Sequence, residues 1–410
     1  MIRGELLRSF MQDLRNQRLR TTLTVLGIAW GTVSVAVLLA FGAGLQRQNL
    51  INARGIGDGL VILWGGKTTK PWDGFPEGRN THLREEYADI IAREVPGVVA
   101  ISPEYSSRSR PTRHGTAASN AAVGGVLPSF SEIRNIFPDS GGRFLDERDM
   151  ADRRRVAFLG DDLKKLLFGD AEAVGRQVFI GAVPFTVIGV MHHKVQNSSY
   201  NARDKDRVFI PASTYHALYG DRYLSNIVFK VADPATSAEV VKQVRAVVAR
   251  HEKFDPVDQD AAPMWDTNEM LKMFWVIFGG INFFLGLVGG FTLLVGGIGV
   301  ANIMFIVVRE RTAEIGIRRS LGARRRDILA QFFSESLFIV ALGASIGMAL
   351  TLLLVRLGAF IPMKEEVGVP ILSPTVLGAT LALLTGVAFI AALFPARKAA
   401  SLDPVECLRY

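Results

Sequence analysis

Several short patterns in this chain are of kinds that perform chemistry in other proteins. Gly65-Gly66-Lys67-Thr68 has the residue types that end a phosphate-binding loop, in which backbone N–H groups and a lysine hold nucleotide phosphates. The complete loop needs a glycine five residues before Gly66, and Val61 stands there. No apolar strand leads through this segment into a helix. The sequence therefore predicts no nucleotide site here.

The other residues that could serve as catalysts or metal ligands are dispersed. The pair His192-His193 would point to opposite sides of a strand, and the acidic cluster from Asp146 to Asp149 is typical of a solvated turn. Ser198-Ser199 lacks the glycines that flank a hydrolase nucleophile. Cys407 is the only cysteine, so residues 46–275 hold no disulfide framework and no thiolate metal site. We predict no catalytic, cofactor-binding or metal-binding residue in this chain.

Composition and the placement of charge indicate a membrane protein. Hydrophobic residues make up 49% of the 410 residues, which excludes intrinsic disorder. The net charge of +8 comes from residues 1–20, 309–327 and 395–410, whereas residues 46–275 are nearly neutral. A nucleic-acid-binding protein concentrates basic residues on a folded domain. Here they flank apolar segments, so we expect a lipid bilayer and no nucleic acid as a partner.

Four segments are long and apolar enough to span a bilayer, which takes about 20 helical residues. They are residues 21–45, 273–308, 328–355 and 371–396. The first is too long for the apolar region of a signal peptide, which has roughly 7–15 residues. The second is long enough to continue beyond the bilayer as a stalk. Its glycines either let helices approach closely or act as kink sites.

The basic segments set the orientation, because positively charged residues stay in the cytoplasm. Residues 1–20 carry apolar residues at helical spacing and are predicted to form an amphipathic helix on the inner leaflet. We also place the loop 309–327 and the tail 397–410 in the cytoplasm. Residues 46–272 and the short loop 356–370 are then extracytoplasmic.

The block 46–272 alternates strand-like and helix-like patterns, which predicts an α+β domain. Residues 59–64 are expected to form a buried strand. Thr236 and Glu239 have the pattern of a capping box at the start of a later helix. Strand patterns dominate between about 125 and 215, with a hairpin signal at residues 181–184. The sequence therefore predicts two subdomains, the second of them a β-rich insertion.

The loop between the second and third spans has the pattern of a short helix. Glu314 and Arg318 stand four residues apart, which is a favourable helical pair. Gly322 is placed to end this helix, and Arg324-Arg325-Arg326 begin the next one. A simple membrane anchor would explain the arginines but not the acidic residues and isoleucines among them.

This loop resembles the signature of MacB-type ABC transporter permeases, a group often described together with FtsX, LolC and LolE. In that family the segment holds the coupling helix that docks on an ATPase subunit. Residues 18–46, 142–160 and 393–409 also resemble the family's first span, periplasmic core and closing segment. The resemblance implies that the ATPase-coupling residues are Glu310, Arg311, Thr312, Glu314, Ile315, Gly316, Ile317, Arg318, Leu321, Gly322 and Ala323.

The resemblance also implies a fold and partners. We expect an α-helical membrane protein of the bacterial inner membrane, with four transmembrane helices and a large extracytoplasmic domain similar to the MacB periplasmic core. The fused ATPase domain of MacB has no counterpart in these residues. ATP and magnesium are therefore expected on a separate ATP-binding subunit, with no cofactor bound by this chain. A second permease subunit, identical or different, is expected, and a periplasmic adaptor and an outer-membrane channel stay open as further partners.

Two kinds of function fit this layout. The leading hypothesis is the permease subunit of an exporter that couples ATP hydrolysis to movement of its periplasmic domain, with efflux from the periplasm or the outer leaflet. The spans offer few strongly polar side chains, among them Glu335 and Asn282, and these are too few for a hydrophilic conduit. We favour a structural role for Glu335, reaching back to the membrane interface. The alternatives are an FtsX-like regulator of envelope hydrolases and LolC/LolE-like lipoprotein extraction.

Overall fold

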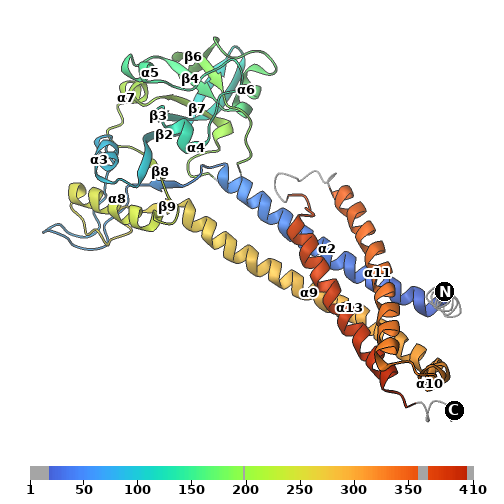
Figure 1. The fold of residues 1–410 in the computed structure, drawn as a ribbon. Helices are drawn as coiled ribbons and strands as arrows, with labels where there is room; N and C mark the ends of the chain where they lie inside the picture. Colours follow the sequence, from blue (N-terminus) through green and yellow to red (C-terminus); the bar gives the residue numbers. More distant parts are fainter. Residues whose placement is uncertain (1–17, 197–198, 359–367, 404–410) are drawn as a thin grey trace. The chain divides into compact units, whose positions relative to one another are not determined.

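The computed structural model describes residues 18–196, 199–358 and 368–403. They divide into two compact units, whose elements are labelled in Figure 1. The helical unit comprises the described residues up to Gln48 and from Val276 onward, and the sheet unit is Asn49–Trp275. Most of the predicted amphipathic helix of residues 1–20, and parts of the loop 356–370 and the tail 397–410, lie outside the described residues.

Four long helices build the helical unit: α2 Arg18–Arg54, α9 Thr267–Glu310, α11 Arg325–Gly358 and α13 Pro374–Ser401. Each is long and apolar enough to cross a membrane, which confirms the predicted four-helix membrane fold. Most of them extend beyond the predicted apolar segments, because polar residues at their ends continue the same backbone hydrogen bonding. The exception is the start of α13 at Pro374, since Ser373 caps this helix and proline favours the first helical position.

The long helices approach one another at glycines. A Cβ atom on Gly347 of α11 would lie 2.6 Å from the carbonyl oxygen of Ala29 in α2, so the two backbones are in direct contact. On α9, a Cβ atom on Gly289 would lie 2.7 Å from a methyl group of Val35. Gly279, also on α9, has nothing within 4 Å of its Cβ position. Close helix contact therefore explains some glycines of the second span, and not all of them.

The sheet unit holds one nine-stranded sheet. Its strands are β1 Leu60–Leu63, β2 Val98–His114, β3 Ala117–Val126, β4 Val156–Leu159, β5 Gln177–Ile180, β6 Val183–Val190, β7 Arg207–Pro211, β8 Asn226–Val231 and β9 Met264–Asp266. Its α-helices are α3 Glu86–Glu94, α4 Phe130–Arg134, α5 Glu147–Ala151, α6 Asp161–Phe168, α7 Ala212–Tyr219 and α8 Ser237–Glu252, and a 3-10 turn, η1, covers Asp204–Asp206.

Strand β2 belongs to both subdomains of this unit. Its first part, Val98 to Glu104, pairs with β8 in the antiparallel order β2-β8-β1-β9, and helices α3 and α8 lie beside these strands in Figure 1. Its second part pairs with both β3 and β5. The remaining pairings close a six-stranded ring, β2-β3-β7-β4-β6-β5. The predicted two-subdomain architecture is confirmed, but the β-rich part begins before residue 125 because β3 and half of β2 belong to it.

Burial on both faces explains the continuous apolar run of β1. Val61 and Leu63 belong to one apolar core, and Leu60 and Ile62 belong to another. Because successive side chains of a strand point to opposite faces, β1 needs apolar residues at every position. The hairpin β5–β6 also forms as predicted, with Ile180 opposite Val183.

The predicted capping box at the start of α8 does not form. The helix begins at Ser237, and the Thr236 side chain caps no backbone N–H group. Its hydroxyl instead donates to the carbonyl oxygen of Asp233 at 3.0 Å. A local turn therefore competes successfully for this side chain.

The residues that follow α2 are packed tightly inside the sheet unit. Ile56 is fully buried between Gly55 and Gly57. A Cβ atom on Gly55 would lie 2.1 Å from the carbonyl oxygen of Val195. Gly57 has a φ of +140°, and a Cβ atom there would lie 2.3 Å from the carbonyl oxygen of Ile133. Only glycine fits this conformation in this space.

We predict that Gly57→Ala lowers the stability of the sheet unit by about 2 kcal/mol or more, because it combines backbone strain with a clash against main-chain atoms. Gly115→Ala is the matched control, since Gly115 also has a positive φ of +56° but nothing within 4 Å of its Cβ position. Urea unfolding of the full chain in detergent measures both variants. Equal losses for the two would contradict the assignment of the Gly57 effect to packing.

Candidate functional site

The segment predicted to couple to an ATPase forms a separate short helix. Helix α10 covers Thr312–Ser320 and is divided from α9 by a single residue, Arg311. The backbone remains almost continuous, because the N–H group of Arg311 donates to Val307 and that of Ile315 donates to Arg311, each at 3.0 Å. The position of α10 is therefore tied closely to the end of α9.

The far end of α10 is closed by the predicted glycine. Gly322 has a φ of +97°, and its N–H group donates to Arg319 at 3.1 Å while that of Ala323 donates to Arg318 at 3.1 Å. These two bonds are the Schellman arrangement that commonly ends helices. The next helix, α11, begins at Arg325, and Arg324 donates its N–H to the Asp327 carboxylate.

Helix α10 has one buried and one exposed apolar side. Ile315 is 3% exposed and belongs to a cluster with residues of all four long helices, among them Phe332 of α11 and Ala399 of α13. Ile317 is 50% exposed and Leu321 is 83% exposed. An apolar residue that is not needed for internal packing is available for contact with another protein.

A chain of polar contacts fastens α10 to α11. Arg318 forms an ion pair with Glu314, as the spacing predicts, and its Nη1 donates to Gln331 Oε1 at 2.8 Å. Gln331 Nε2 donates to Glu335 Oε1 at 3.1 Å. Arg311 Nη1 donates to the same carboxylate oxygen at 3.3 Å.

Glu335 makes a structural contact with Arg311, the residue between α9 and α10. Its side chain is 8% exposed, and the Arg311 side chain paired with it is 10% exposed. The carboxylate therefore stays within the protein, where its contact with Arg311 compensates part of the cost of burial.

The structure brings together only some of the residues predicted for coupling. Four of them face α11, namely Arg311, Glu314, Ile315 and Arg318. The gap between their side chains and α11 has a volume of only about 10 Å³, so the two helices are packed closely here. The other predicted coupling residues lie elsewhere on the segment. Glu310, Ile317, Leu321 and Gly322 are exposed, Gly316 is buried within α10, Ala323 packs beside the apolar cluster, and the Thr312 hydroxyl bonds to carbonyl oxygens of α9.

Sequence reasoning missed three partners of this segment. The sequence predicts neither the contacts of Gln331 and Glu335 with this segment nor the hydrogen bond from Arg319 Nη1 to the carbonyl oxygen of Leu402, which follows α13. The spacing of Gln331 and Glu335 was the available signal, because two polar residues four apart lie on one face of an otherwise apolar helix.

The sheet unit contains a second set of charged residues, in a fully buried cluster. Glu104 Oε1 lies 2.5 Å from Arg207 Nη2. Arg134 Nη2 donates to both carboxylate oxygens of Asp204, each at 2.8 Å. All four side chains are 0% exposed. Tyr200 and Asn226 also donate to Glu104, each at 2.6 Å, and Asn201 donates at 3.2 Å. The cluster joins β2, α4, β7 and β8 across the boundary between the two subdomains.

One further cation belongs to this cluster. Lys194 Nζ lies 2.8 Å from Asp204 Oδ2 and donates to the carbonyl oxygen of Arg134 at 2.6 Å. Burial would raise the pKa values of Glu104 and Asp204, but the neighbouring arginines hold both below their usual values. Burial lowers the pKa of Lys194 to about 8, against the attraction of Asp204. The paired and buried groups are suited to holding elements together and not to reaction with a substrate.

The acidic cluster at Asp146 is a helix start and not a solvated turn. Asp146 and Asp149 form a capping box at α5, and Asp149 is fully buried. Arg143 Nη1 lies 2.6 Å from Asp149 Oδ2. Although burial would raise the pKa of Asp149, the hydrogen bond from Arg143 holds it below its usual value.

The segment that resembles a phosphate-binding loop uses its backbone N–H groups internally. Gly66 donates to Thr81 Oγ1 at 2.8 Å, Lys67 donates to Asp260 at 3.0 Å and Thr68 donates to Arg79 at 2.9 Å. These groups are therefore not available to phosphate oxygens.

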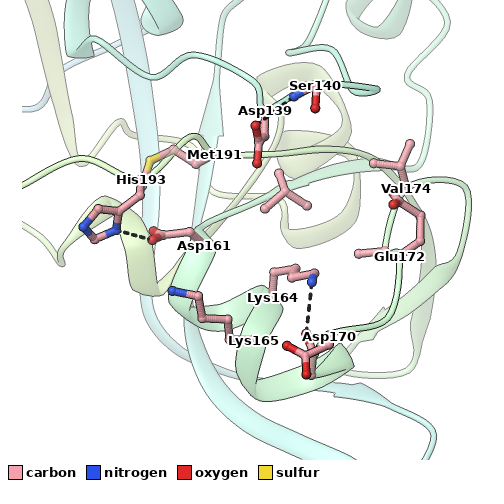
Figure 2. Close-up of a pocket in the computed structure, with 13 residues that line it drawn as sticks. Asp139, Ser140, Asp161, Lys164, Lys165, Asp170, Glu172, Val174, Met191 and His193 are labelled. Carbon is pink, nitrogen blue, oxygen red and sulfur yellow. Dashed lines mark hydrogen bonds and ion pairs between the residues drawn. The ribbon is translucent and has the colours of Figure 1, made fainter.

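A pocket of about 360 Å³ opens beside α6, and Figure 2 shows the side chains around it. His193 Nδ1 contacts Asp161 Oδ2 at 2.6 Å, and Lys164 Nζ donates to the carbonyl oxygen of Gly169 at 3.0 Å. His192 lies apart, 3.7 Å from Asp139. Among residues 18–196, 199–358 and 368–403, no group of three side chains could hold a metal ion. The pocket thus has mixed charge without a catalytic arrangement.

The four long apolar helices and the α+β unit of two subdomains define a multi-pass membrane protein with a large domain outside the spans. Residues 21–247 match the model of the MacB-like periplasmic core domain, and residues 286–404 match that of the FtsX-like permease C-terminal domain. The chain belongs to the MacB-type family of ABC transporter permeases, so the sheet unit is its periplasmic domain.

The relatives of this chain are longer proteins. It is 33% identical over 411 residues to the macrolide export ATP-binding/permease protein MacB of Rhodospirillum rubrum, covering 99% of this chain and 60% of that protein. It is 36% identical over 417 residues to the pyoverdine export ATP-binding/permease protein PvdT of Pseudomonas putida, with the same two coverages. The chain thus spans about 60% of the length of these relatives.

Among solved structures, the periplasmic region of MacB from Actinobacillus actinomycetemcomitans resembles the chain with a TM-score of 0.43 and 18% identity. This match covers 55% of the present chain and 96% of that structure.

We predict that the Lys194 charge lowers the stability of the sheet unit at neutral pH. The pKa of Lys194 is about 8 in the folded chain and 10.5 when unfolded. Because the unfolded chain binds the extra proton between these values, the free energy of unfolding should rise with pH from about 8 to 10.5, by about 3 kcal/mol. Lys194→Met should abolish this rise, whereas the exposed Lys242→Met should keep it. Urea unfolding at pH 7 to 10.5 measures it, and an unchanged pH dependence in Lys194→Met would contradict the assignment.

Proposed function

We propose that this chain is the permease subunit of an ABC exporter and works by mechanotransmission. An ABC ATP-binding subunit docks on α10, and ATP binding and hydrolysis there move the helical unit. The long helices carry this movement to the periplasmic domain, which acts on a substrate in the periplasm or the outer leaflet. The relatives whose names specify macrolide or pyoverdine export favour this function over regulation of envelope hydrolases.

The observation that carries the proposal is the exposed apolar edge of a firmly held helix. Ile317 and Leu321 stand four residues apart in the coupling segment, so they form one patch. Arg324, Arg325 and Arg326 follow and are exposed. This combination fits an ATPase groove with an apolar floor and an acidic rim. The residues opposite this edge are occupied by internal contacts, so a push on the patch is passed to the helical unit.

The polar side chains of the long helices support mechanical coupling over passage through the membrane. Asn282 Nδ2 donates to Gln46 Oε1 at 3.2 Å, and Glu335 is paired with Arg311. The hydroxyls of Thr32, Thr351 and Thr380 bond to carbonyl oxygens of their own helices. These polar groups therefore serve contacts within or between helices, which supports a mechanical role over a polar path for a solute.

The basic segments give the orientation that this function requires. The arginines of residues 309–327 belong to the cytoplasmic side by the preference of positive charge. With the sheet unit in the periplasm, an even number of spans supports a cytoplasmic side for both ends of the chain. The docking segment then faces the compartment that contains ATP.

We expect that Ile317→Asp combined with Leu321→Asp lowers the amount of ABC ATPase that co-purifies with the chain from native membranes by at least about tenfold, because charge is introduced into an apolar contact. Leu166→Asp is the control, since Leu166 is 54% exposed on α6 of the sheet unit and should change nothing. Quantitative mass spectrometry of the purified complexes measures the effect. Wild-type amounts of ATPase in the double variant would rule out this docking surface.

Thiol labelling tests the orientation. In a Cys407→Ser background, a membrane-impermeant maleimide added to intact spheroplasts should label Thr116→Cys, in the exposed turn between β2 and β3. Leu321→Cys should react only after lysis. The reverse pattern would show that the orientation is inverted.

A further inference from the structure

Two residues of α11 hold α10 from outside the coupling segment. Gln331 contacts Arg318, in the last turn of α10, and Glu335 contacts Arg311, just before its first residue. The two arginines are seven residues apart, about 10 Å along a helix. A helix attached at both ends to one face of a neighbour can neither slide nor turn on it without breaking a contact.

The side chain of Gln331 makes the two attachments depend on each other. Its Oε1 accepts from Arg318, and its Nε2 donates to the carboxylate that also receives Arg311. Turning the amide to improve one contact would break the other. The four side chains therefore form one cooperative unit.

Stability alone does not account for this arrangement. Glu335 is 7% exposed, and its Oε2 is buried without a hydrogen bond from the described residues. Burying an ion pair with a half-satisfied carboxylate costs about as much as the attraction returns, and apolar residues of similar size would serve stability as well. What the pair supplies is a defined position of α10 on α11.

The other contacts of α10 are of a different kind. It joins α9 through one residue, and the polar contact described between it and the end of α13 is a hydrogen bond from Arg319 to a backbone carbonyl, beside the apolar packing of Ile315. Only the contacts with α11, among those described, link paired side chains at both ends of the helix. Ile317 and Leu321 take no part in these contacts, so docking and attachment use different residues.

We propose that Gln331 and Glu335 are positioning residues that lock α10 to α11, so that a displacement of α10 is delivered to the third span. This proposal rests on the proposed function for its use, since an ATPase would supply the displacement. The residues of this lock are not those proposed for docking, which are Ile317 and Leu321. Loss of the lock should leave ATPase binding intact and remove only the transmission of movement.

Hydrogen–deuterium exchange of the full chain in detergent tests the lock without any ATPase. Arg311→Met combined with Glu335→Met leaves no unpaired buried charge, so the protein should fold, but amides of residues 312–323 should exchange about tenfold faster. The charge exchange Arg311→Glu with Glu335→Arg should restore slow exchange. Arg325→Gln is the control, because Arg325 is exposed in the first turn of α11. Unchanged exchange in the double Met variant, or no recovery in the exchanged pair, would overturn the proposal.

A second measurement separates the lock from docking. With the co-purified ATPase, the double Met variant should retain wild-type ATPase binding, while ATP no longer changes exchange in the sheet unit. Loss of ATPase binding together with transmission would overturn the proposal, because the pair would then belong to the docking surface. If no ATPase co-purifies with the wild-type chain, the proposed function fails, and exchange in residues 312–323 still decides whether the lock exists.

Discussion

The burial of one side of α10 against the long helices is the interaction on which the arrangement of the loop between α9 and α11 depends. Ile315 enters a cluster built from all four long helices, and Arg311 and Arg318 bind the same face of α11. Without these contacts a nine-residue helix would be marginal in water. With them, its exposed edge at Ile317 and Leu321 becomes a fixed surface.

A similar constraint operates in the sheet unit. Glu104, Arg207, Arg134 and Asp204 are buried together at the boundary of two subdomains that share β2. These buried ion pairs add little to the net free energy of unfolding. Breaking one of them, however, leaves its partner as an unpaired buried charge, which is strongly destabilising. The two subdomains are therefore held in one arrangement, and the tight entry of the chain at Gly55 and Gly57 fixes the residues that follow α2 against α4 and the Lys194 segment.

Much of the architecture was predictable because its signals are local. Apolar length predicts the four long helices, and the strand and turn patterns predict a two-subdomain α+β unit. Glu314 with Arg318 and Gly322 were assigned correctly because an i,i+4 pair and a helix end depend on neighbours in sequence. The errors arose where a side chain had several possible partners. The Thr236 side chain bonds within a turn and does not cap α8, and Asp149 is buried in a capping box.

The sequence by itself determined the number of spans, the family and the position of the short helix between the second and third spans, because hydropathy, charge placement and short motifs are properties of contiguous residues. Only the tertiary structure decided that β2 closes a ring with strands far along the chain. It also decided that Lys194 joins a buried charge cluster and that Gln331 and Glu335 hold α10. The residues in these contacts are far apart in the sequence, and no periodic pattern of residue types relates them. The contacts form only when the helices and strands pack together.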